Sequence, residues 1–112
     1  NQITFSKFYL QSVIQNLVSN AIKYKRDNVA SHIEFESAIE NKHKVLYVRD
    51  NGMGLNLEKH GENIFKLYKR FHRNISGKGM GLFLIKSQLE ALNATITIDS
   101  KVGEGTTFKI KF

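Results

Sequence analysis

Asn16, Asn20 and Lys23 recur at helical spacing in the run NLVSNAIKY, which spans residues 16–24. At about 100° per residue, these three side chains fall within about 60° of one another on a helix. An amide oxygen can ligate a hard cation such as Mg²⁺, and a nearby lysine can meet a phosphate. The alternative is a packing helix that tolerates two asparagines, since asparagine is a poor but permitted helix residue.

The helix that carries this polar row is predicted over about residues 6–24, with Ser6 as the candidate N-cap. Its apolar side chains fill the neighbouring arc: Leu10, Val13, Ile14, Leu17, Val18 and Ala21. The polar row is therefore expected to border the core instead of facing open water.

A second candidate group follows two alternating runs, His32–Ala38 and Val45–Asp50, which predict adjacent antiparallel strands. The second run ends in DNGMGL, and Asn-Gly after a strand is a strong hairpin signal. However, no alternating return strand follows. We therefore expect Gly52 and Gly54 to bend the backbone beside a ligand, and Asp50 to accept hydrogen bonds from that ligand.

Three further glycines, Gly77, Gly79 and Gly81, lead into a helix predicted over residues 82–92. A glycine-rich turn at a helix N-terminus favours an anion, because unpaired N–H groups and the helix dipole point at it. The spacing fits neither a Walker A loop nor a Rossmann fingerprint. The preceding segment, Ile64–Arg73, mixes aromatic and basic residues. This composition is compatible with a plain amphipathic helix whose basic face lies in solvent.

The chain ends in a predicted hairpin, with strands at Ala94–Asp99 and Thr106–Phe112 and a turn at Ser100–Gly105. Alternation along the last strand places Thr106 on the core-facing side, together with Phe108, Ile110 and Phe112.

Composition limits the class of protein. The 112 residues, 41% of them hydrophobic, are enough for a single domain over residues 1–112. The absence of Cys excludes disulfides and thiol chemistry, and no apolar run is long enough to span a bilayer. The absence of Pro and the abrupt helical start suggest a piece of a longer chain. The net charge of +7 suits nucleic acid, an acidic partner or a polyphosphate and does not choose among them. The sequence contains no RNP-like sheet motif, helix-turn-helix spacing or zinc ligand set, which argues against nucleic acid.

The order of these motifs resembles the catalytic and ATP-binding domain of sensor histidine kinases, in the superfamily that includes gyrase, Hsp90-type chaperones and MutL. NLVSNAIKY matches the asparagine box, VRDNGMGL the first glycine box and IFKLYKRF the phenylalanine box. GKGMGLFLIK matches the second glycine box and VGEGTTFKI the last. The resemblance extends from Leu10 to Phe112. It implies an α+β two-layer sandwich, the Bergerat fold, whose mixed and mostly antiparallel sheet is covered on one face by helices.

The resemblance also implies the cofactors ATP and Mg²⁺. Asn20 would ligate Mg²⁺ with Asn16 beside it, while Lys23 would approach the phosphates and Tyr24 the adenine ring. Asp50 would accept the adenine amino hydrogen. The other residues implied at the site are Gly52 and Gly54 beside the base, Thr106 in support of it, Arg70 on the terminal phosphate, and Gly77, Lys78, Gly79, Met80, Gly81 and Leu82 in the lid.

In ATP-hydrolysing members of the superfamily, a glutamate general base stands where this chain has Asn16. Asparagine cannot take a proton near neutral pH, so we expect slow hydrolysis and transfer of the phosphoryl group to a histidine. In the family that this chain resembles, the histidine that accepts the phosphoryl group is normally followed by an acidic residue. None of the four histidines of this chain, at positions 32, 43, 60 and 72, is followed by one. The acceptor is therefore expected on a separate dimerisation domain, with a response regulator as the next partner.

The resemblance implies a cytoplasmic domain that is monomeric when isolated, from a parent that is a homodimer. It leaves open whether the parent is anchored in the inner membrane. Two other functions remain: a nucleotide-dependent scaffold without catalysis, and a serine kinase of the anti-sigma type. The lid between Arg73 and Gly77 is short, which predicts modest affinity.

Overall fold

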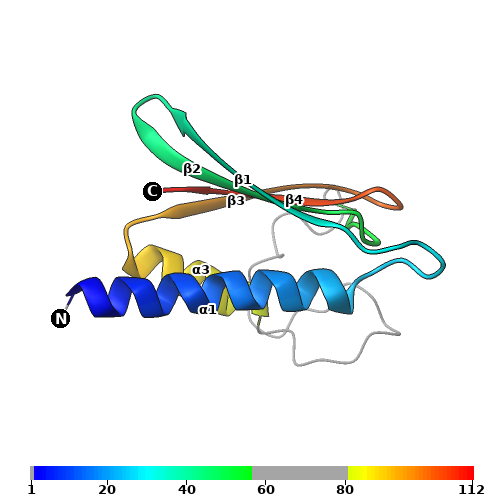
Figure 1. The fold of residues 1–112 in the computed structure, drawn as a ribbon, viewed down its shortest axis with the longest axis horizontal. Coiled ribbons are helices and arrows are strands. Elements are labelled where there is room, and N and C mark those ends of the chain that lie inside the picture. The colour runs from blue at the N-terminus through cyan, green and yellow to red at the C-terminus, as the bar shows by residue number, and fades with distance from the viewer. Residues whose placement is uncertain (1, 57–80) are drawn as a thin grey trace.

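The computed structural model describes residues 2–56 and 81–112. The elements are α1 (Gln2–Lys23), β1 (Ile33–Glu40), β2 (His43–Asp50), α3 (Gly81–Ala91), β3 (Thr95–Lys101) and β4 (Gly105–Lys111). The two helices lie side by side on one face of the sheet (Figure 1). The predicted α+β architecture, with helices covering one face, is therefore confirmed.

The four strands have the order β1-β2-β4-β3, and every neighbouring pair is antiparallel. The expected sheet was mixed, but the described strands contain no parallel pair. This order places β2 and β4 at the centre, so Asp50 at the end of β2 lies opposite Thr106 at the start of β4. Two residues that are 56 positions apart in the chain thereby meet at one end of the sheet.

Strands β1, β2 and β3 are longer than the sequence patterns predict, because the turns are tighter, whereas β4 has the predicted length. Asn41 and Lys42 alone connect β1 to β2, with φ angles of 51° and 69°. Positive φ at both turn residues is the geometry that matches the right-handed twist of a two-residue hairpin. The sequence patterns end the first strand at Ala38 and begin the second at Val45, so the connection that they predict is too wide.

Helix α1 also extends beyond its prediction. It begins at Gln2, so Ser6 lies inside the helix and is not its N-cap. The residues from Gln2 to Phe5 include no helix breaker, which explains why the helix continues through them. Its end at Lys23 agrees with the prediction within one residue. Among the described residues, neither helix is long and apolar enough to cross a membrane.

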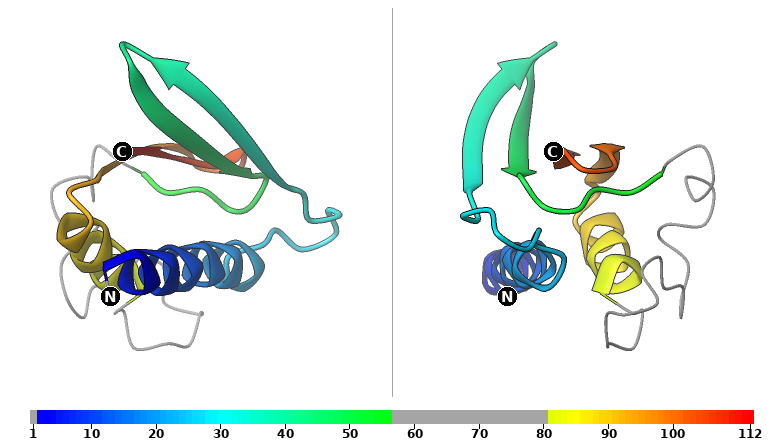
Figure 2. Two further views of the ribbon diagram at one scale, coloured as in Figure 1. Left: turned by 60° about the vertical axis from the view of Figure 1, so that its left-hand side comes forward. Right: turned by 90° about the vertical axis from the view of Figure 1, so that its right-hand side faces the viewer.

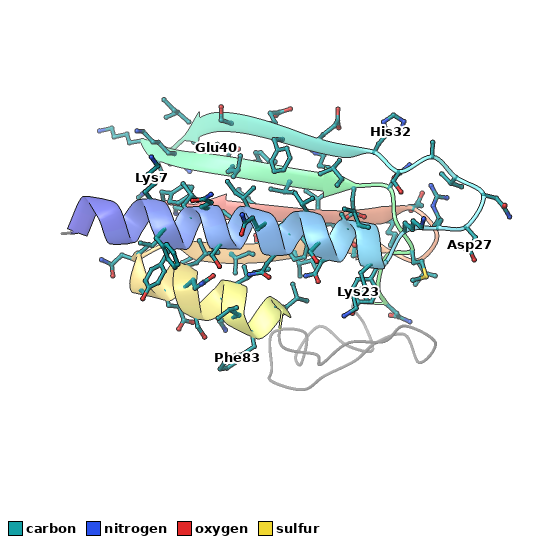
Figure 3. All side chains as sticks on the ribbon, turned by 60° about the horizontal axis from the view of Figure 1, so that its bottom comes forward. Lys7, Lys23, Asp27, His32, Glu40 and Phe83 are labelled. Atoms are coloured by element: carbon teal, nitrogen blue, oxygen red, sulfur yellow. The ribbon has the colours of Figure 1, made fainter. Side chains whose placement is uncertain are left out.

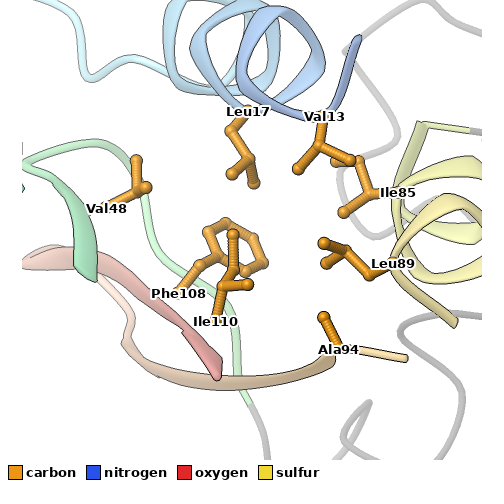
Figure 4. Close-up of a cluster of buried hydrophobic side chains, with 8 residues drawn as sticks. All are labelled: Val13, Leu17, Val48, Ile85, Leu89, Ala94, Phe108 and Ile110. Carbon is orange, nitrogen blue, oxygen red and sulfur yellow. The ribbon is translucent and has the colours of Figure 1, made fainter. Parts of the chain in front are cut away.

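The hydrophobic core lies between the helices and the sheet (Figure 4). It draws side chains from α1, β2, α3 and β4 and from the residue before β3: Val13, Leu17, Val48, Ile85, Leu89, Ala94, Phe108 and Ile110. Burial of each large aliphatic side chain contributes about 1.5–3 kcal/mol. The β1–β2 turn rises away from the helices (Figure 2), and Ile39 beside it is 76% exposed.

The opposite face of the sheet carries paired polar side chains, which we call the hairpin face: Glu36, Glu40, Tyr47, Arg49 and Lys109. Lys109 lies 2.9 Å from Glu40, and Tyr47 donates a hydrogen bond to the same carboxylate. Arg49 lies 3.4 Å from Glu36 and 4.8 Å from the centroid of the Tyr47 ring.

Candidate functional site

The polar row of α1 borders the core, as the helical spacing predicts. Asn16, Asn20 and Lys23 are half-buried, whereas Val13 and Leu17 in the neighbouring arc are buried. No residue in the described ranges, 2–56 and 81–112, is seen to hydrogen-bond the side-chain amide of Asn16 or Asn20. With respect to the described residues, both amides retain donor and acceptor capacity for a ligand.

Asp50 is half-buried and held by backbone groups. Its Oδ1 accepts a hydrogen bond from the Gly52 N–H at 2.8 Å, and the Thr106 N–H also donates to the carboxylate. Burial raises the pKa of Asp50 above its usual value, and these two backbone donors oppose part of that rise. Within the described part of the chain, no lysine or arginine forms an ion pair with Asp50. As far as the described residues go, the carboxylate can accept a hydrogen bond from a donor on a ligand.

The glycines after Asp50 allow close backbone approach. A Cβ at Gly52 would lie 2.7 Å from the Tyr24 carbonyl oxygen. Gly54 has φ +71°, and a Cβ there would lie 1.9 Å from the Lys101 carbonyl oxygen. Residues 51–56 can therefore pass between the end of α1 and the end of β3 only with glycine at both positions. This explains why Asn-Gly here does not make a hairpin.

Backbone hydrogen bonds join three segments around Asp50, and we call their meeting place the junction: residues 24–26, 50–56 and 100–106. The Met53 N–H donates to the Tyr24 carbonyl at 2.8 Å, and the Gly103 N–H donates to the Met53 carbonyl at 2.7 Å. Tyr24 also follows Lys23 directly in the chain. The junction is therefore continuous with the polar row of α1.

Arg26 is a further part of the junction that the sequence did not single out. Its Nε donates to the Asn51 carbonyl at 2.9 Å, and its Nη1 donates to the Gly103 carbonyl at 2.8 Å. Asn51 in turn accepts from the His32 N–H and donates to the Ala30 carbonyl, both at 2.8 Å. In the sequence, Arg26 is one of several basic residues in KYKR, and nothing distinguishes it from Lys25.

Ser100 is the second residue that sequence reasoning missed. Its Oγ lies 2.8 Å from Thr106 Oγ1, accepts from the Leu55 N–H at 2.8 Å and donates to the Gly105 carbonyl at 2.9 Å. Thr106 is 9% exposed and lies on the helix-facing side, as alternation predicts. The Ser100 hydroxyl therefore bonds both to the Thr106 hydroxyl and to the loop that follows Asp50, and so holds the two in place.

The remaining predicted site residues divide into two groups. Gly81 and Leu82 begin α3, as expected, and Leu82 also packs against the core. Another five lie outside the described residues: Arg70, Gly77, Lys78, Gly79 and Met80.

The described residues fit a magnesium site with few protein ligands. None of their His, Asp and Glu side chains converge in a group of three or more that could hold a metal ion. Mg²⁺ commonly takes one or two protein oxygens and completes its shell with water and phosphate. The half-buried amide of Asn20 is an oxygen donor of that kind. A cavity of about 240 Å³ opens beside Asp50 and Thr106, and its lining also includes residues of the hairpin face such as Arg49.

The chain is similar to a known protein family. The family model described as histidine kinase-, DNA gyrase B- and HSP90-like ATPase matches residues 7–112. The chain is 38% identical over 107 residues to Cyanobacterial phytochrome B of Nostoc sp. and 31% identical over 103 residues to the sensor histidine kinase WalK of Bacillus subtilis. These alignments cover 91% and 88% of this chain but 14% and 16% of the relatives.

Two solved structures have the same fold. The mycobacterial sensor histidine kinase MprB gives a TM-score of 0.79 at 20% identity, over 93% of this chain and 71% of that one. Full-length ShkA in complex with AMPPNP gives 0.74 at 19% identity, over 92% of this chain and 21% of that one.

Proposed function

The chain belongs to the histidine kinase-, DNA gyrase B- and HSP90-like ATPase family, and from this premise we propose that it binds Mg-ATP and donates the γ-phosphoryl group to a histidine on a separate domain. Its relatives include sensor kinases such as WalK, which supports a role in two-component signalling. The chain spans about a seventh of the phytochrome relative, so the acceptor histidine and the response regulator are proposed partners.

The environment of the Asp50 carboxylate is the observation that carries this proposal. The carboxylate is half-buried, is held by the backbone N–H groups of Gly52 and Thr106, and forms no ion pair within the described residues. A buried anion without a cation is costly, so proteins retain such a group where it has a use. Here that use is to accept a hydrogen from the adenine amino group. Full-length ShkA, a structural neighbour, was solved with AMPPNP, a nucleotide that carries the same base.

At the phosphate end, we propose that Asn20 ligates Mg²⁺ and that Asn16 lies beside the metal. Lys23 would contact a phosphate, since its ammonium group is near the end of the polar row and 5.7 Å from the Tyr24 ring. Mg²⁺, when bound, neutralises charge on the phosphate oxygens. Arg70 and the lid residues 77–82 are proposed to surround the terminal phosphates, with Arg70 offering a planar pair of donors.

Asn16 also bears on the fate of the phosphoryl group. Asn16 has no basic group that could deprotonate water, so the site holds ATP without rapid hydrolysis. Transfer to another acceptor needs positioning and charge neutralisation more than covalent help from the protein. We propose that the acceptor is a histidine of a dimerisation domain in a homodimeric parent, and that this domain acts in the cytoplasm as a monomeric unit, without nucleic acid.

Calorimetric titration tests the binding step. ATP with Mg²⁺ is expected to bind the isolated chain more tightly than ATP without Mg²⁺ and more tightly than GTP. Absence of binding at millimolar ATP would show that the proposed pocket does not hold nucleotide. The chain would then fit a scaffold that uses the fold without its ligand.

Radiolabel transfer tests the acceptor. With γ-labelled ATP and the dimerisation domain of a sensor kinase, label on that domain should be acid-labile and base-stable, as phosphohistidine is. Acid-stable label on a serine would instead support the serine kinase alternative.

A further inference from the structure

The Ser100 hydroxyl has three polar neighbours, all between 2.8 and 2.9 Å from its oxygen. They are the backbone N–H of Leu55, the backbone carbonyl of Gly105 and the hydroxyl of Thr106. A hydroxyl has one proton to donate and two lone pairs to accept with. Three neighbours therefore use its full hydrogen-bonding capacity.

Two of these neighbours have fixed roles. The Leu55 N–H can only donate, so it takes one lone pair of Ser100. The Gly105 carbonyl can only accept, so it takes the single Ser100 proton. The third bond, to Thr106, must then use the Thr106 proton. The Thr106 hydroxyl is thus directed toward Ser100, and only its lone pairs are left for anything else.

Thr106 and Asp50 are register partners in the last pair between β2 and β4, at one end of the sheet. The ionised carboxylate of Asp50 is also an acceptor without a proton. Both groups therefore present acceptors from the same end of β2 and β4, and a matching ligand must supply N–H groups to both.

We propose that Ser100 is a positioning residue that makes this end of the site acceptor-only, so that the site takes a 6-aminopurine nucleotide and rejects a 6-oxopurine. The inference rests on the proposed ATP binding and deepens it. A 6-amino group has two N–H donors, directed to Asp50 and, directly or through a water, to Thr106. A 6-oxo group has none, so its oxygen would face two acceptors and stay unpaired.

The test compares ATP with ITP, which differs from ATP only in the 6-oxo group and its N1 proton. Calorimetry on the full chain with Mg²⁺ should give tighter binding of ATP by roughly 5- to 150-fold, the cost of one unpaired polar group. Ser100→Ala frees the Thr106 proton to donate into the site. The ATP-to-ITP affinity ratio should then fall by about fivefold or more. An equal weakening of both nucleotides would overturn the proposal, because simple loosening of the loop predicts it.

A second variant guards against misfolding of Ser100→Ala. Thr106→Val is nearly isosteric and leaves the bonds of Ser100 to Leu55 and Gly105 intact. It should also lower the ATP-to-ITP ratio, and an unchanged ratio would overturn the proposal. Thr97→Ala is the matched control, because it removes an exposed hydroxyl from the same strand and should leave the ratio unaltered.

Proton NMR tests the hydrogen-bond direction without nucleotide. In the free chain, the Thr106 hydroxyl proton should exchange slowly and show a nuclear Overhauser contact to the Ser100 β-protons, and Ser100→Ala should abolish that contact. A Ser100 hydroxyl proton directed at Thr106 would overturn the inference. If the wild-type chain bound neither nucleotide, the proposed function would fail while this measurement still decided the direction of the proton.

Discussion

Asp50 of the junction and Glu40 of the hairpin face are both carboxylates, and the fold shifts their pKa values in opposite directions. Figure 3 places Lys23 and His32 at one end of the molecule and Glu40 near the other. The Tyr47 hydroxyl and the Lys109 ammonium group hold the pKa of Glu40 below its usual value. Burial raises the pKa of Asp50 above its usual value. The Glu40 carboxylate is satisfied within the fold, whereas Asp50 keeps acceptor capacity for a ligand.

The two regions also differ in what holds them together. The junction depends on backbone hydrogen bonds and on glycines that let main chains approach. The hairpin face depends on long, partly exposed side chains. A side chain added at Gly52 or Gly54 of the junction must move backbone, while a substitution on the hairpin face needs only a rotamer change. We therefore expect large mutational effects in the junction and small ones on the hairpin face.

The largest effect is expected from Gly54→Ala. Its φ of +71° and the Cβ contact of 1.9 Å with the Lys101 carbonyl add strain to a steric clash. The free energy of unfolding should fall by about 3 kcal/mol or more. Gly103→Ala is the matched control, because its φ is +81° but nothing lies within 4 Å of its Cβ. That variant should lose about 1 kcal/mol. Equal losses in urea denaturation would contradict the role assigned to close packing.

Asp50→Asn should separate binding from stability. The amide places N–H donors where the adenine amino group donates, so ATP affinity should fall by roughly 10- to 150-fold, or about 1.5–3 kcal/mol. Thermal stability at neutral pH should stay the same or rise, because the buried charge is removed. Glu40→Gln, the control on the hairpin face, should leave ATP affinity unchanged. Calorimetry and thermal melts check both, and an ATP affinity unaffected by Asp50→Asn would remove Asp50 from the pocket.

Arg26→Ala should loosen the junction without changing the hairpin face. It removes charged donors from two backbone carbonyls, those of Asn51 and Gly103, and should cost about 1–2 kcal/mol. Amide exchange of Met53 and Gly103 should accelerate, while exchange in the β1–β2 pair should not. Lys25→Ala makes the same charge change at an exposed neighbour and is expected to alter neither. Similar exchange in both variants would show that Arg26 does not hold the loops.

The two carboxylates should affect stability in opposite directions as pH changes. The pKa of Asp50 is raised by folding, so its contribution is present below the unfolded pKa and is lost as pH rises through the higher folded value. The pKa of Glu40 is lowered, so its contribution is present above the unfolded pKa and is lost as pH falls through the lower folded value. Carboxyl carbon NMR titration should give a pKa for Asp50 above that of an ordinary aspartate and a pKa for Glu40 below that of an ordinary glutamate. Shifts of the same sign would refute the comparison.

The smallest effect is expected from Glu36→Gln. This residue forms an exposed pair with Arg49 at 3.4 Å, and such pairs contribute little because solvent screens them. The free energy of unfolding should change by less than about 0.5 kcal/mol in urea denaturation. A larger loss would mean that the hairpin face is more tightly coupled than its exposure indicates.

The sequence was sufficient to predict most of the fold. Helical spacing around Val13 and Leu17 identified the buried stripe of α1, and alternation placed Thr106 with Phe108 and Ile110. These patterns are local, and each follows from the period of one element. The errors were at the ends of elements. Ser6 was taken for a cap, the β1–β2 turn was made too wide, and Phe112, which follows the end of β4 and is 38% exposed, was assigned to the core-facing side.

The sequence was not sufficient to predict how the junction is held. The bond between Arg26 and Gly103 joins residues 77 positions apart, and no periodicity connects them. Ser100 was assigned only to a turn, because its role depends on Leu55 approaching from another segment. Gly105 was likewise assigned to a turn, although a Cβ there would lie 2.0 Å from the Asp50 carbonyl oxygen. Such contacts arise only once the sheet has brought β2 and β4 together.

The separation between Arg26 and Gly103 also has a consequence for the order of folding. Contacts between distant residues form after local ones, because closing a long loop costs entropy before the contact offsets it. Helix α1 and the β1–β2 hairpin can form from the first 50 residues, but the junction needs the chain as far as Thr106. During synthesis, the pocket therefore cannot exist until nearly the whole domain has emerged, and an incomplete chain cannot sequester nucleotide.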